Sequence, residues 1–86
     1  MNILDSAAKT IVLVQPRTAA EGGVQLKFIA ATLDMRQIDI ARAYQVDRQD
    51  VNKMVHGMKR IPERCVPVHM LLLELAQKSI LVKEVA

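Results

Sequence analysis

The sequence predicts a small all-α domain of about five short helices that contains a helix-turn-helix, with a short β strand as the alternative at each terminus. A chain of 86 residues has room for one domain and one modest core. Hydrophobic residues make up 51% of the chain, but they include only one Phe, one Tyr and no Trp, as in an aliphatic helical core. Apolar residues also recur at helical spacing along most of its length.

The N-terminal part is ambiguous. Residues 10–14, TIVLV, have the β-branched density of a strand, whereas the residues before them suit the start of a helix equally well. Residues 16–23 predict a linker, which Gly22 and Gly23 punctuate. We therefore expect residues 1–23 to form an arm or strand followed by a linker.

The first dependable helix is expected over residues 24–33, where four apolar residues recur at i, i+3, i+4 and i+7. These four are Leu26, Ile29, Ala30 and Leu33. Two further helices are expected over residues 36–43 and 48–56, the second with the stripe Val51, Met54, Val55 and Met58. Residues 24–78 then form the folded domain.

The turn between these two helices has the spacing of a helix-turn-helix. Ala41 is small enough to let the second helix cross closely, and Val51, ten positions later, fills the wedge between the helices. Asp47 is a suitable N-cap for the second helix. The outward residues of that helix can bond base edges or phosphates, and none is a carboxylate. They are Arg48, Gln49, Asn52, Lys53 and His56.

The C-terminal part is expected to contain one more long helix. Gly57 should end the preceding helix in a left-handed conformation, and Pro67 is suited to the first turn of a helix over residues 68–78. This helix has more apolar side chains than one face can bury, a surplus that usually marks an interface. They are Met70, Leu71, Leu72, Leu73 and Leu75. Residues 79–86 have strand composition and could pair with residues 10–14 or with a second chain.

The net charge of +3 is concentrated in one region. Residues 36–64 hold seven Lys and Arg against four acids, whereas the segments on either side are balanced. The basic excess therefore coincides with the predicted helix-turn-helix, as expected of an electrostatic footprint for nucleic acid.

The single cysteine, Cys65, excludes an internal disulfide and fits a reducing cytosol. Cys65, His69 and His56 match structural zinc spacings poorly, so we expect no metal and no cofactor. No apolar stretch approaches the length of a membrane span. There is no nucleophile–base constellation, Gly-rich phosphate loop or useful pair of carboxylates, so we expect neither an enzyme nor a small-molecule substrate.

Residues 37–57, QIDIARAYQVDRQDVNKMVHG, resemble the helix-turn-helix of the lambda-repressor/Cro superfamily without a gap. Residues 59–65, KRIPERC, resemble a segment found in its YdaS-like branch, and the resemblance extends over about residues 26–76. Two positions depart from the pattern: Gln45 stands where Gly is usual in the turn, and Arg36 stands where a Ser or Thr cap is usual, with Asp34 as the nearest substitute.

The resemblance implies roles for several residues. Gln37 would meet a phosphate, while Arg48, Gln49, Asn52 and Lys53 would face base edges, with His56 on the same outward face. Lys59 and Arg60, in the loop that follows, would clamp phosphates without sequence preference.

The expected function is a sequence-specific double-stranded DNA-binding transcriptional regulator in the cytoplasm, of the phage or bacterial repressor type. It would be a homodimer formed through residues from about Met70 to Val85. The alternative is an antitoxin-like or adaptor module that keeps the helix-turn-helix shape and works through its Leu-rich C-terminal helix.

Overall fold

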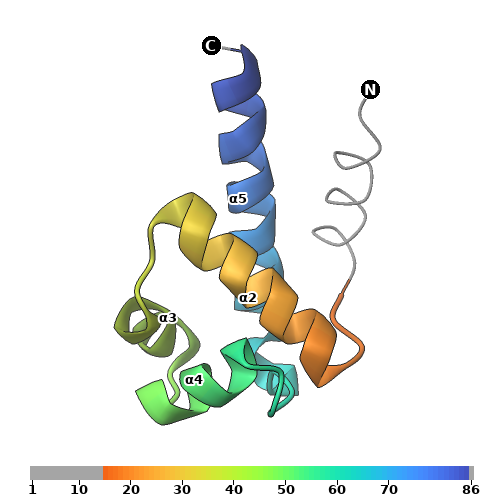
Figure 1. Ribbon diagram of the computed structural model, residues 1–86, viewed down its shortest axis with the longest axis vertical. Coiled ribbons are helices and arrows are strands. Elements are labelled where there is room, and N and C mark those ends of the chain that lie inside the picture. The colour runs from red at the N-terminus through yellow and green to blue at the C-terminus, as the bar shows by residue number, and fades with distance from the viewer. Residues whose placement is uncertain (1–14, 86) are drawn as a thin grey trace.

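The computed structural model describes residues 15–85, and within that range the chain is helical without a strand (Figure 1). The elements are α2 (Ala19–Leu33), α3 (Gln37–Tyr44), α4 (Arg48–Val55), the 3₁₀ turn η1 (Glu63–Cys65) and α5 (Val66–Val85). The all-α prediction is confirmed. In Figure 1, α3 and α4 lie together at one end, α2 crosses in front of α5, and α5 extends away from α4. The predicted strand over residues 10–14 lies outside the described residues.

Helix α2 begins at Ala19, five residues before the predicted start, so the linker predicted over residues 16–23 is wrong from residue 19 onward. Thr18 is its N-cap: the Oγ1 atom accepts a hydrogen bond from the backbone N–H of Glu21 at 3.1 Å. This bond satisfies one of the amides that a helix start leaves without a partner. The cap at Thr18 and the packing of α2 against α4 together offset the low helix propensity of two consecutive glycines.

The two glycines of α2 lie within the helix and allow it to pack closely against its neighbours, instead of forming a loop. A Cβ atom on Gly23 would lie 2.8 Å from the carbonyl oxygen of Val55 and 2.9 Å from that of Met54. The backbone of α2 therefore nearly touches the C-terminal end of α4, and only glycine leaves room at this crossing. A Cβ atom on Gly22 would meet side chains instead of backbone: that of Ile61 at 3.1 Å and that of Pro16 at 3.9 Å.

The core joins all the helices. One cluster of buried residues draws on α2, α3, α4 and η1: Leu26, Ile40, Ala41, Tyr44, Val51, Met54 and Cys65. A second, smaller cluster joins Ile29 of α2 to Leu73 of α5. Ala41 and Val51 are both buried, as predicted from their spacing. Met58 is 76% exposed, so its inclusion in the apolar stripe was wrong: Gly57, with φ of 73°, ends the helical path before it.

The C-terminal segment is helical instead of a strand. Pro67 lies in the first turn of α5, as predicted, but the helix continues through Ser79 to Val85. The prediction of a strand over residues 79–86 is therefore wrong for residues 79–85. Over so few positions, an alternation of apolar residues fits the last turns of a helix as well as it fits a strand. No turn signal lies between Ser79 and the helix before it.

A chain of buried polar side chains links three helices through His69 of α5. The Tyr44 hydroxyl of α3 lies 2.7 Å from His69 Nδ1, and His69 Nε2 lies 2.7 Å from Gln25 Oε1 of α2. Because the amide oxygen can only accept, Nε2 carries the proton and Nδ1 accepts from the Tyr44 hydroxyl. His69 is fully buried, and this desolvation lowers its pKa to about 4. The native protein thus holds a neutral imidazole.

The first prediction concerns Gly23. Gly23→Ala should lower the free energy of unfolding by about 1 kcal/mol or more, because the new methyl group collides with backbone carbonyls of α4. This loss should exceed the gain of about 1 kcal/mol that Ala normally brings to a helix. Gly22→Ala is the matched control: the Ile61 side chain can move, so stability should hold or rise. Chemical denaturation of both variants checks this, and equal effects would contradict the packing argument.

The second prediction concerns pH. The pKa of His69 is lowered in the folded state, so its contribution to stability is present above about pH 6.5 and is lost as the pH falls toward 4. The loss should be roughly 2–3 kcal/mol, because unfolding then takes up a proton. In His69→Gln the free energy of unfolding should change less with pH over this range. This expectation holds whatever the stability of the variant at neutral pH. His56→Gln, at an exposed histidine, should leave the slope as it is. Equal slopes in all three proteins would contradict the assignment.

Candidate nucleic-acid interface

The turn between α3 and α4 is built on a residue other than glycine. Gln45 takes the left-handed conformation, with φ of 56° and ψ of 49°. Arg64 donates from its guanidinium to the carbonyl oxygens of Tyr44 at 3.4 Å and of Gln45 at 3.3 Å. The Cys65 thiol also donates to the Tyr44 carbonyl, at 3.3 Å. These bonds satisfy carbonyls that the end of α3 leaves open, which helps to hold the strained turn.

The start of α3 is fixed by Asp39, which sequence reasoning did not single out. Its carboxylate accepts from the backbone N–H of Arg36 at 2.8 Å and from Arg36 Nε at 3.2 Å. The Arg36 guanidinium and these hydrogen bonds lower the pKa of the Asp39 carboxyl. Asp34 has φ of 53° and ends α2, so it does not cap α3. Gln37 is thereby held at the first position of α3.

The start of α4 is set by Asp47 through its backbone. Asp47 is extended at the N-cap, and its carbonyl accepts the first helical bond, from the Val51 amide at 3.1 Å. Its side chain makes no capping hydrogen bond, so the predicted side-chain cap is wrong. Burial of Val51 fixes the rotation of α4 about its own axis, which turns its polar residues outward.

Five of the eight predicted site residues meet at one hollow of about 340 Å³. They are Gln37, Arg48, Gln49, Asn52 and Lys53. The four from α4 are exposed and Gln37 of α3 is half-buried beside them. Asn52 Nδ2 donates to Gln37 Oε1 at 3.4 Å, which joins the two helices across the hollow. No carboxylate lines it, so its polar atoms are amides and cations alone.

The other three predicted residues lie apart from this hollow. His56 is exposed at the C-cap of α4. Lys59 and Arg60 line a second hollow, of about 630 Å³, with the residues that precede α2. Lys59 Nζ pairs with Asp50 Oδ1 at 3.1 Å, and Arg60 Nη2 donates to the carbonyl oxygen of Arg17 at 3.0 Å. These two basic side chains are therefore held by contacts to α4 and to Arg17, just before α2, which sequence reasoning missed.

The residues considered as zinc ligands have other partners. His69 bonds to Tyr44 and Gln25, and Cys65 bonds to the Tyr44 carbonyl, while His56 lies on the surface. Among the residues that the structure describes, no three His, Cys, Asp or Glu side chains gather where they could hold a metal ion. Over the same residues, none of the helices combines the length and apolar character needed to cross a membrane.

In comparisons with known proteins, no protein-family model, no curated protein and no solved structure matches this chain.

Proposed function

We propose that this protein is a sequence-specific double-stranded DNA-binding transcriptional regulator that acts in the cytoplasm as a repressor. The observation that carries the proposal is the hollow in which Gln37, Arg48, Gln49, Asn52 and Lys53 meet. The two helices, joined by a tight turn, present amides and cations there, and no carboxylate lines the hollow. In this proposal α4 enters the major groove while α3 lies across the phosphate backbone.

The chemistry of each side chain suits a separate task. Arg48, at the start of α4, can bond O6 and N7 of guanine with its two terminal nitrogens. Gln49 and Asn52 carry the donor–acceptor pair that matches N6 and N7 of adenine. The hydrogen bond from Asn52 to Gln37 supports an orientation in which the Asn52 amide oxygen remains free to accept. Gln37 keeps its amide N–H groups for a phosphate.

We further propose that the protein binds DNA as a homodimer, because one short recognition helix reads only a few base pairs. Two-fold pairing lets two copies of the chain each bind one half of a symmetric DNA site, without a second kind of chain.

An antitoxin-like or adaptor module remains a second candidate, since Leu71 is 54% and Leu75 is 45% exposed on α5. Salt-dependent binding to duplex DNA separates the two functions. The DNA-binding proposal is tested by site selection from random duplexes at a stated salt concentration.

The third prediction concerns direct base recognition. Arg48→Ala and Gln49→Ala should each weaken binding to the selected site by roughly 1–3 kcal/mol while changing binding to random DNA less. Both side chains are exposed at the start of α4, so truncation should leave the fold intact. Lys27→Ala, an exposed lysine of α2 outside both hollows, is the control. Titration by fluorescence anisotropy measures the change, and parental affinity in both folded variants would refute this docking of α4.

The fourth prediction concerns the second hollow. Lys59→Ala and Arg60→Ala should weaken binding to specific and random DNA alike, because phosphate contacts carry no sequence information. Each lost phosphate contact should lower the slope of log affinity against log salt by about 0.9. Binding titrations over a series of salt concentrations provide the test. An altered base preference with an unchanged slope would show that these residues read sequence instead.

A further inference from the structure

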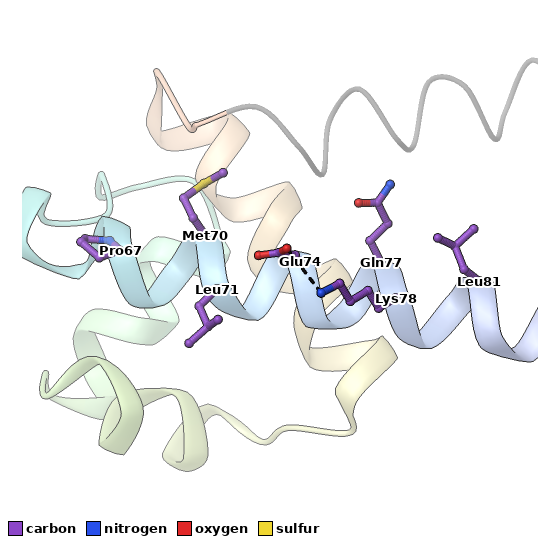
Figure 2. Close-up of a pocket in the computed structure, with 7 residues that line it drawn as sticks. All are labelled: Pro67, Met70, Leu71, Glu74, Gln77, Lys78 and Leu81. Carbon is purple, nitrogen blue, oxygen red and sulfur yellow. Dashed lines mark ion pairs between the residues drawn. The ribbon is translucent and has the colours of Figure 1, made fainter.

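Helix α5 carries an exposed stripe on the side that faces away from the core. His69, Leu73 and Ala76 on its inner side are fully buried. On the outer side, residues spaced three and four apart line an open depression of about 560 Å³ (Figure 2). They are Pro67, Met70, Leu71, Glu74, Gln77, Lys78 and Leu81. The stripe therefore follows one face of the helix for about four turns.

The stripe combines exposed leucines with one pair of opposite charges. Leu71 is 54% and Leu81 is 40% exposed, one toward each end of the stripe. Between them, Glu74 Oε1 and Lys78 Nζ lie 3.5 Å apart, and both side chains remain more than half exposed. The ion pair is drawn as a dashed line in Figure 2, between Leu71, which points down in this view, and Leu81, which points up. Leucines that flank a central charged pair form a pattern suited to a helix partner.

We propose that this α5 stripe packs antiparallel against the same stripe of a second copy of this chain, about a two-fold axis level with Ala76. The arrangement rests on the proposed function, because it gives the expected homodimer its contact surface. Position 76 is midway between Leu71 and Leu81, and it is also midway between Glu74 and Lys78. A single antiparallel alignment about position 76 therefore sets both pairs opposite each other across the two chains.

Two-fold symmetry makes each of these contacts occur twice. Leu71 lies level with the partner's Leu81, and Glu74 lies level with the partner's Lys78. The central charges then form a ring of alternating sign across the axis. A parallel pairing would instead set glutamate against glutamate and lysine against lysine, which costs free energy. The charges of the stripe thus select both the partner and the direction of packing.

The remainder of the molecule is consistent with this contact. The stripe has one acid and one base, so it presents no net charge to attract the DNA backbone. The C-terminal end of α5 points away from α4 in Figure 1, and the linings of the two surfaces share no residue. Contact between the two α5 helices therefore uses none of the residues of the proposed DNA-binding surface.

The experiment measures association without DNA, by sedimentation equilibrium of the full chain and its variants. E74K and K78E should each weaken self-association roughly tenfold or more, because each places like charges opposite one another twice. An equimolar mixture of E74K and K78E should form heterodimers at close to parental affinity. Within each of these variant chains, residues 74 and 78 carry like charges and still repel each other. A restored affinity must therefore come from contacts between the two chains. A mixture of E63K and K27E has the same net charges off α5 and should associate like the parent.

Cysteine pairs test the direction of packing. A mixture of L71C and L81C should form a disulfide-linked heterodimer under mild oxidation, because the two positions lie level across the axis. L71C alone should not link to itself, since its two copies would lie about 15 Å apart along the helix axes. Val24→Ser, at a residue 51% exposed on α2, should leave association unchanged, whereas Leu71→Ser should weaken it.

Two results would overturn the arrangement. One is a monomer at concentrations that saturate a palindromic DNA site, and the other is efficient self-linking of L71C, which would require a parallel pair. Neither result bears on DNA binding itself, which is measured separately. Conversely, a dimer in this register that fails to bind duplex DNA would refute the proposed function and leave the contact in place.

Discussion

The hydrogen-bonded chain from Gln25 through His69 to Tyr44 is the interaction on which the rest of the structure depends. It is buried, it crosses three helices, and no buried side-chain nitrogen or oxygen among the described residues lacks a hydrogen-bond partner. A buried polar group without a partner costs more free energy than a satisfied one contributes. The chain therefore permits few arrangements of α2, α3 and α5, which gives the small aliphatic core a specific geometry.

Tyr44 transmits this constraint to the surface. Its hydroxyl is held by His69, and its carbonyl oxygen accepts from Arg64 and Cys65 at the point where α3 ends. The left-handed Gln45 follows directly, and α4 begins three residues later. On its other side α4 is fixed by the close approach of Gly23. The orientation of the outward residues of α4 thus follows from contacts deep in the molecule.

The two ends of the molecule carry different chemistry. The hollow at α3 and α4 is lined by amides and cations, while the Asp50 carboxylate of α4 pairs with Lys59. On the outer face of α5 they are leucines with a balanced pair of charges. A polar surface suits a hydrated, charged partner such as duplex DNA, whereas an apolar stripe suits another helix. These two surfaces share no residue.

The sequence by itself determined the helices of the turn motif and their outward residues, because helical periodicity and the Ala41–Val51 spacing are local properties. It also identified the five residues of the first hollow, since rotation about the helix axis follows from the buried stripe. Only the tertiary structure decided the contacts between residues that lie far apart in the sequence. The sequence places Gly23 in a linker, whereas in the structure Gly23 packs against the backbone of α4. His69 and Lys59 acquired their partners only through packing.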